Sequence, residues 1–220
     1  MTKFSTFHWR YDRSEIIADG IVHGVGVAAA LVAVTVLIFY ATVWGTPALI
    51  AASWVYGLGL IASLGISFAY NIWPVSPVKW ALRRFDHSAI FILIAATYTP
   101  FLAAALPDGL VLANLIGIWA VAAFGVALKF FWPGRFDKLS ILLYLAMGWS
   151  GVAIAGKLST VLSLATLVLI LIGGIIYSLG VIFHVWEKLR FQNAIWHGFV
   201  VTAAGVHYAA VLTCVIWQSA

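Results

Sequence analysis

The sequence predicts an all-α integral membrane protein, a bundle of seven transmembrane helices. Hydrophobic residues make up 64% of the 220 residues and charged residues only 9%, and the mean hydropathy is +1.07. A soluble domain usually carries about 25% charged residues, whereas a membrane span needs about 20 apolar residues in a row. The chain holds seven such stretches separated by short polar segments. We therefore expect a single transmembrane domain, 1–220.

Apolar stretches and proline positions place the helices in order. The polar residues 1–19 predict a cytoplasmic N-terminal segment ahead of the first span. The predicted helices cover 20–43, 49–73, 88–106, 110–131, 139–155, 161–186 and 194–217. Five of the six prolines fall between these helices, where a missing N–H costs least. Because every connection is short, helices adjacent in sequence should pack antiparallel.

Basic residues predict the orientation. Eleven of the twelve lysines and arginines lie in the N-terminal segment or beside the second, fourth and sixth loops, and only Lys157 lies in the loops of the other side. The positive-inside rule makes the basic side cytoplasmic. We expect a cytoplasmic N-terminus and a periplasmic C-terminus. Because the positive charges flank membrane spans, the net charge of +5 indicates orientation and predicts no nucleic-acid binding.

Polar residues from several helices gather near the cytoplasmic ends of the spans. Ionisable groups at membrane depth are costly and usually face the bundle interior, so a shared level predicts one polar cavity. Glu15, Asp19 and His23 are spaced four apart and line one stripe of the first helix. The other members of the cluster are Ser67, Asn71, Asp86, His87, His184, Asn193 and His197, with His207 nearer the middle of the last helix.

Each of these residues also has a purely structural interpretation. Glu15 and Asp19 suit the positive end of a helix, Asp86 suits an N-cap, and His184 suits a helix C-terminus. Taken together, a serine, an aspartate and several histidines at one depth are typical of a metal site that activates water. They are equally typical of a proton relay, in which carboxylates and imidazoles pass protons along a polar chain.

Four segments carry a family resemblance. The segments EIIADGIVHGVG (15–26), RFDHSAIF (84–91), ATYTPF (96–101) and NAIWH (193–197) together resemble the bacterial hemolysin III proteins. These are grouped with the progestin and adiponectin receptors (PAQR), among seven-helix membrane proteins that include alkaline ceramidases. The resemblance covers nearly the whole chain and implies a multi-pass protein of the bacterial inner membrane.

The resemblance also implies a zinc site near the cytoplasmic leaflet. The family builds it from a Ser-x-x-x-His pair on the second helix, an aspartate on the third and a His-x-x-x-His pair on the seventh. Ser67, Asp86 and His197 match this pattern, whereas Asn71 and Asn193 stand at the two remaining histidine positions. Zinc favours nitrogen and sulfur donors over amide oxygens. His184, where relatives more often carry an aromatic residue, is a candidate replacement ligand.

Two hypotheses follow. In the first, the cytoplasm-facing cavity is a metal-assisted hydrolase of a lipid-like amide or ester. Asp86 would deprotonate water, a metal held partly by His197 would stabilise the oxyanion, and Ser67 would orient the substrate. In the second, the protein is a membrane sensor or a proton-coupled homeostasis protein with a metal-free site. We expect the metal-free network and, as partners, membrane lipids.

Overall fold

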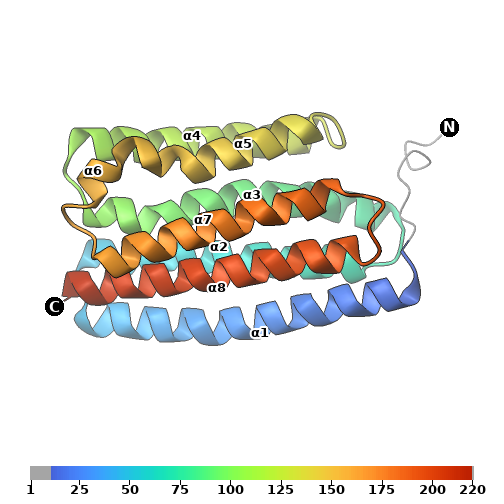
Figure 1. Cartoon of the computed structure of the whole chain (residues 1–220), viewed down its shortest axis with the longest axis horizontal. Coiled ribbons are helices and arrows are strands. Elements are labelled where there is room, and N and C mark those ends of the chain that lie inside the picture. Colours follow the sequence, from blue (N-terminus) through green and yellow to red (C-terminus); the bar gives the residue numbers. More distant parts are fainter. Residues whose placement is uncertain (1–10, 220) are drawn as a thin grey trace.

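The computed structural model describes residues 11–219, which form an elongated bundle of roughly parallel and antiparallel helices (Figure 1). Seven spans are long and apolar enough to cross a membrane, so the predicted all-α seven-span class is confirmed. The elements are α1 (Arg13–Trp44), α2 (Pro47–Ile72), α3 (Pro77–Ala104), α4 (Gly109–Phe131), α5 (Asp137–Trp149), η2 (Ser150–Ile154), α6 (Ala155–Leu158), α7 (Leu164–Val185) and α8 (Gln192–Ser219).

The first helix begins earlier than predicted. Asp12 caps α1 by accepting a hydrogen bond from the Glu15 backbone N–H at 2.9 Å, and the Glu15 carboxylate accepts one from the Asp12 N–H at 2.9 Å. This reciprocal capping box satisfies two backbone donors that a helix start leaves free. Of the predicted N-terminal segment 1–19, residues 1–10 lie outside the described part of the chain, and the residues from Arg13 onward are helical.

The third helix also begins earlier, at Pro77 rather than residue 88. Ser76 caps it by accepting from the Lys79 N–H, and Pro77 occupies the first turn, where proline is favoured. The predicted start was wrong because this basic segment was taken as a loop. In the structure, the Lys79 ammonium is buried and donates to the carbonyls of Asn71 and Trp73 at the end of α2.

The fifth span is interrupted, where the sequence predicted one continuous helix. α5 ends at Trp149, and the chain continues through the 3₁₀ segment η2 and the short α6. The Tyr98 hydroxyl of α3 donates to the Gly148 carbonyl at 2.6 Å and accepts from the Gly151 N–H at 3.0 Å. It therefore satisfies backbone groups that the broken helix leaves unpaired.

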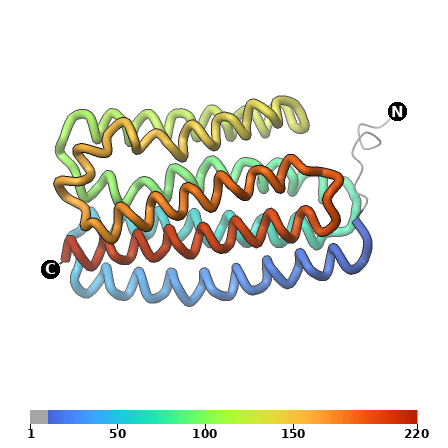
Figure 2. Tube along the Cα trace, in the orientation of Figure 1, coloured from blue at the N-terminus to red at the C-terminus, as the bar shows by residue number. Residues whose placement is uncertain are grey.

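Helix α3 lies at the centre of the bundle and contacts α2, α4, α5 and α8, while α8 packs against both α7 and α1 (Figure 2). Two glycines permit close approach. A Cβ at Gly125 on α4 would collide with the Phe91 ring, and one at Gly173 on α7 would collide with the His207 ring. This packing brings the N-terminal end of α1 beside the N-terminal end of α8.

Candidate functional site

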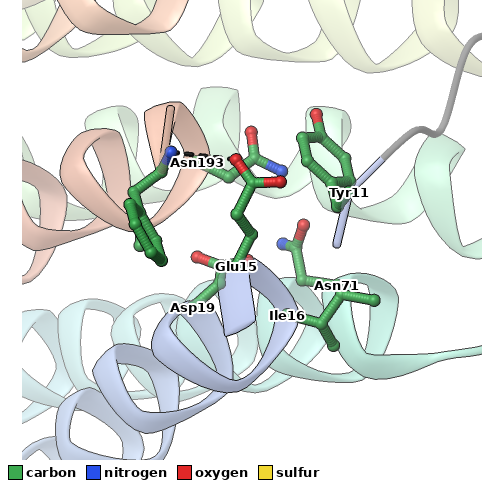
Figure 3. Close-up of a pocket in the computed structure, with 8 residues that line it drawn as sticks. Tyr11, Glu15, Ile16, Asp19, Asn71 and Asn193 are labelled. Atoms are coloured by element: carbon green, nitrogen blue, oxygen red, sulfur yellow. Dashed lines mark hydrogen bonds between the residues drawn. The ribbon is translucent and has the colours of Figure 1, made fainter. Parts of the chain in front are cut away.

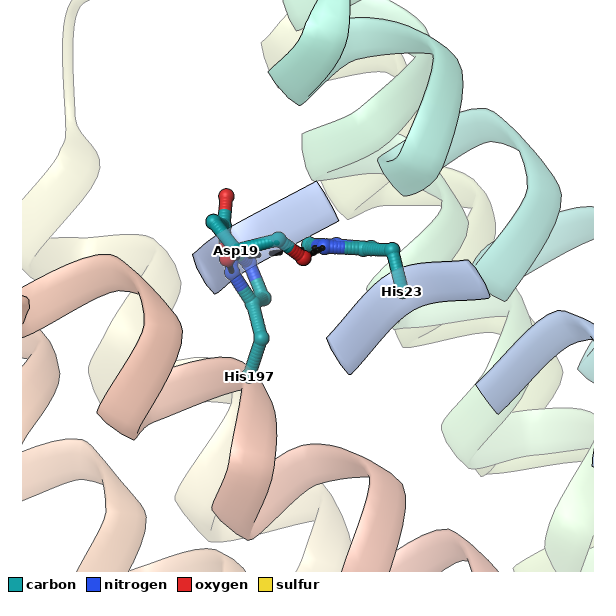
Figure 4. Close-up of side chains that lie close together, drawn as sticks. All are labelled: Asp19, His23 and His197. Atoms are coloured by element: carbon teal, nitrogen blue, oxygen red, sulfur yellow. Dashed lines mark hydrogen bonds and ion pairs between the residues drawn. The ribbon is translucent and has the colours of Figure 1, made fainter. Parts of the chain in front are cut away.

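Three side chains from α1 and α8 form a buried cluster near one end of the bundle (Figure 4). Asp19 and His23 lie one turn apart on α1 and are 5% and 2% exposed. His197 reaches them from α8, and its Nδ1 lies 2.7 Å from Asp19 Oδ1. The rings of His23 and His197 are 4.2 Å apart between centroids. A carboxylate and two imidazoles, far apart in sequence, thus share one small volume.

Hydrogen bonding fixes the tautomer of each histidine. His23 Nδ1 lies 2.9 Å from the Asp19 carbonyl oxygen, and a carbonyl can only accept, so Nδ1 carries the proton. His23 Nε2 is then the acceptor for the Ser67 hydroxyl at 3.1 Å. An ionised Asp19 carboxylate likewise only accepts, so His197 Nδ1 donates to it. Both imidazoles therefore hold their protons toward Asp19.

The network extends into α2 through Ser67 and Asn71, which lie one helical turn apart. Asn71 Nδ2 donates to the Ser67 carbonyl at 2.9 Å and approaches the Ser67 hydroxyl at 3.4 Å. The chain of donors runs from Asn71 through Ser67 to His23. As it stands, the network connects three helices and satisfies these buried polar groups with protein partners.

A small cleft connects this cluster to the end of the bundle (Figure 3). Asp19, Asn71 and Asn193 line it from α1, α2 and α8, together with Tyr11 and Glu15. The cleft has room for about one water molecule. Burial raises the pKa of the Tyr11 phenol.

Glu15 has a structural role at the rim of the cleft. Its Oε1 accepts a hydrogen bond at 2.9 Å from the N–H of Phe191, which has a positive φ of 58°. Positive φ is uncommon outside glycine and needs support from its surroundings. Glu15 thereby ties the α7–α8 turn to α1 and holds His197 in register with Asp19.

A second polar group lies on α3 and α7. Asp86 Oδ2 is 3.3 Å from His87 Nδ1, and Ser67 and His197 also interact electrostatically with Asp86. The ring of His184 lies tilted against that of Trp196, with 4.9 Å between the centroids. Among residues 11–219, the buried Nδ1 atoms of His87 and His184 have no hydrogen-bond partner. The hydrogen-bond partner of His197 is Asp19, whereas Asp86 lies within ion-pair distance of His87 without a hydrogen bond between them.

His207 lies outside this constellation. Its Nε2 is 3.2 Å from the Ile170 carbonyl of α7, and its ring packs beside Tyr177 at 5.4 Å. The close approach allowed by Gly173 gives it a packing role between α7 and α8. Of the residues singled out from sequence, His207 makes the contacts most distant from the cluster.

Comparison with known proteins shows the family of this chain. The family described as "Haemolysin-III related" matches residues 13–208. The chain belongs to this family. It is 37% identical over 198 residues to the "Hemolysin-3 homolog" of Bacillus subtilis (strain 168), covering 90% of this chain and 93% of that one.

Two further haemolysin-III relatives extend the comparison. The "Hemolysin-3" of Bacillus cereus is 38% identical over 202 residues, 92% of each chain. The human "Monocyte to macrophage differentiation factor" is 33% identical over 165 residues, which cover 72% of this chain and 68% of the human one. The resemblance expected from the four sequence segments is confirmed.

The zinc site implied by the haemolysin-III resemblance does not fit the residues at its five positions. Only His197 is an imidazole there. The Asn71 amide nitrogen is turned to the Ser67 carbonyl, leaving an amide oxygen where zinc prefers nitrogen. One imidazole, one carboxylate, one hydroxyl and two amides are a poor donor set for zinc, so no chemistry is derived through a metal at these positions.

A different donor set lies close by. Ligand atoms of Asp19, His23 and His197 are all within 4.8 Å of one another. Both Nδ1 atoms donate to Asp19, so a metal would have to take the Nε2 atom of each ring, and His23 Nε2 already accepts from Ser67. In the structure these three side chains form a hydrogen-bonded network. The sequence placed Asp19 on one stripe with Glu15 and His23 but did not predict its bond to His197, which lies 178 positions away.

Proposed function

We propose that this haemolysin-III-related protein is a proton-responsive membrane protein, a sensor or a proton-coupled homeostasis protein with a metal-free site. Protonation of the cluster formed by Asp19, His23 and His197 would change how α1 packs against α2 and α8. The observation that carries this proposal is the buried carboxylate of Asp19, which accepts from His197 at 2.7 Å and lies 3.5 Å from His23 Nδ1. Histidine is the side chain suited to switching charge near neutral pH.

The chemistry of the switch follows from the tautomers. A proton added to His23 enters at Nε2, which now accepts from Ser67. The protonated Nε2 must donate, so the Ser67 hydroxyl hydrogen has to rotate away and its oxygen becomes the acceptor. Because Asn71 also donates toward Ser67, the rearrangement reaches the end of α2. Protonation of His23 on α1 is thereby coupled to the packing of α1 against α2.

We further propose that the proton enters from the cytoplasm and that the protein lies in a bacterial inner membrane. The cleft beside Asp19 opens near the α7–α8 turn, at the end of the bundle that carries the basic loops. The positive-inside rule assigns this end to the cytoplasm. One water molecule in the cleft, which Asn71 also lines, would suffice to bring a proton toward Ser67 and His23 Nε2.

Hydrogen–deuterium exchange tests the proposal. Protection of α1 and α8 is compared at mildly acidic and neutral pH, corrected for intrinsic exchange rates, in the purified protein in lipid nanodiscs. We expect a pH-dependent change at these helix ends that His23→Gln and His197→Gln abolish. His207→Gln is the matched control and should keep the change. If the wild-type protein exchanges equally at both pH values, or the two variants respond as it does, the proposal is wrong.

A second candidate is a metal-assisted hydrolase of a lipid-like amide or ester. It is supported by the close approach of Asp19, His23 and His197 and by Asp86 and Ser67 beside them. In this function Asp86 would take a proton from water and Ser67 would orient the substrate. Stoichiometric zinc that survives mild chelation and is lost in His197→Ala, together with hydrolysis of such lipids, would favour this candidate over the first.

A further inference from the structure

Cationic side chains gather at the corner where α3, α4 and α5 meet. Arg83 Nη2 lies 2.9 Å from Asp137 Oδ2, and Lys129 Nζ lies 2.7 Å from Asp137 Oδ1. Arg83 and Lys129 are only 8% and 2% exposed. Both oxygens of the single carboxylate are therefore occupied by buried cations. We call Arg83, Arg84, Lys129 and Asp137 the basic corner.

Positive charge exceeds negative charge at this corner. Arg84 follows Arg83 on α3, and its buried Nε has no hydrogen-bond partner among the described residues. Arg83 and Lys129 thus share the Asp137 carboxylate, with Arg84 next to Arg83 on α3, while Asp86 lies 3.3 Å from His87 Nδ1. A buried cation needs a counter-charge and partners for its N–H groups. The corner is therefore suited to an additional anion.

The surroundings indicate that this anion carries apolar chains. Phe85 on α3 and Phe130 on α4 pack edge to face at 5.0 Å and remain 45% and 36% exposed. Phe131 and Trp132 next to them are 74% and 46% exposed. Exposed aromatic residues at a span end are typical of the membrane interface. The Asp137 side chain is 41% exposed, so the corner is open on this side.

We propose that the basic corner binds the phosphate headgroup of an anionic phospholipid, with the acyl chains lying along Phe85 and Phe130. The guanidinium of Arg84 supplies a planar pair of donors suited to phosphate oxygens, and Lys129 adds a point charge. Basic pockets between helices at the cytoplasmic face are known to hold anionic headgroups. The site is independent of the cluster around Asp19.

Lipid binding to the purified full-length protein tests this inference. Native mass spectrometry compares phosphatidylglycerol with phosphatidylcholine, and inorganic phosphate is added in a separate arm. We expect preferential binding of phosphatidylglycerol, and Arg84→Gln should weaken it about tenfold, as loss of a charged hydrogen bond predicts. Lys188→Gln, an exposed basic residue of the α7–α8 turn, is the charge-matched control and should bind as the wild type does.

A second variant should strengthen the binding of phosphatidylglycerol. Asp137→Asn removes the carboxylate that Arg83 and Lys129 contact, so the stabilisation by phosphatidylglycerol, measured as a rise in melting temperature, should increase. Arg84→Lys keeps the charge and should retain part of the binding if Arg84→Gln folds poorly. Four results would each overturn the proposal. The two lipids could bind equally, or Lys188→Gln could weaken binding as much as Arg84→Gln does. Asp137→Asn could reduce the stabilisation by phosphatidylglycerol, or inorganic phosphate could compete fully with the lipid.

Discussion

The Asp19 carboxylate is the strongest single point at which to test the network. Asp19→Ala removes the acceptor of the 2.7 Å bond from His197 and leaves a buried N–H without a partner. A hydrogen bond to a charged group contributes about 1.5–3 kcal/mol, and an orphaned buried group adds a further penalty. We expect the free energy of unfolding to fall by about 2–4 kcal/mol. Asp19→Asn keeps an acceptor oxygen and should cost about 1–2 kcal/mol.

Thermal unfolding in detergent or nanodiscs measures these effects. For a chain of this size, 1 kcal/mol corresponds to about 2–4 °C in melting temperature, on the scaling of soluble proteins. Asp19→Ala should therefore lower the melting temperature by about 4–16 °C, whereas Glu187→Gln, an exposed acidic residue near the same end, should leave it unchanged. The order wild type, Asp19→Asn, Asp19→Ala is part of the prediction.

A double-mutant cycle separates the contact from general damage. Asp19→Ala and His197→Ala should be strongly non-additive, with a coupling energy of about 1–3 kcal/mol, because each removes the other's partner. If the losses of unfolding free energy in the two single variants add to that of the double variant within about 0.5 kcal/mol, the reasoning is refuted. Asp19 and His197 would then share no bond in the membrane-embedded protein.

Three further predictions concern metal binding, topology and packing. Asn71→His combined with Asn193→His should create stoichiometric zinc binding, detectable by metal analysis of the purified protein; an unchanged metal content would contradict the assignment of these positions. A topology reporter fused to the C-terminus should read periplasmic and one in the α4–α5 loop cytoplasmic, and a cytoplasmic C-terminus would contradict the seven-span orientation. Gly125→Ala should cost about 1–3 kcal/mol because its Cβ meets the Phe91 ring, whereas Gly117→Ala, with open space around it, should be tolerated.

The sequence was sufficient to predict much of the fold. Hydropathy requires only that apolar residues recur over a span's length, which is a local property, and all seven spans were found. Boundaries were less accurate where short-range capping decided them, as at Asp12 and Ser76. The break after Trp149 could not be predicted, because the Tyr98 hydroxyl that satisfies the broken backbone comes from another helix.

For the candidate site too, some features follow from the sequence and others only from the tertiary structure. The sequence by itself determined the family and the residue types, and the four-residue spacing placed Asp19 and His23 on one face of α1. Only the tertiary structure decided that His197 pairs with Asp19 and that Asp86 pairs with His87. Such choices depend on how far each helix is rotated and slid against its neighbours. That rotation is set by close packing over the whole bundle, which no local pattern along the chain encodes.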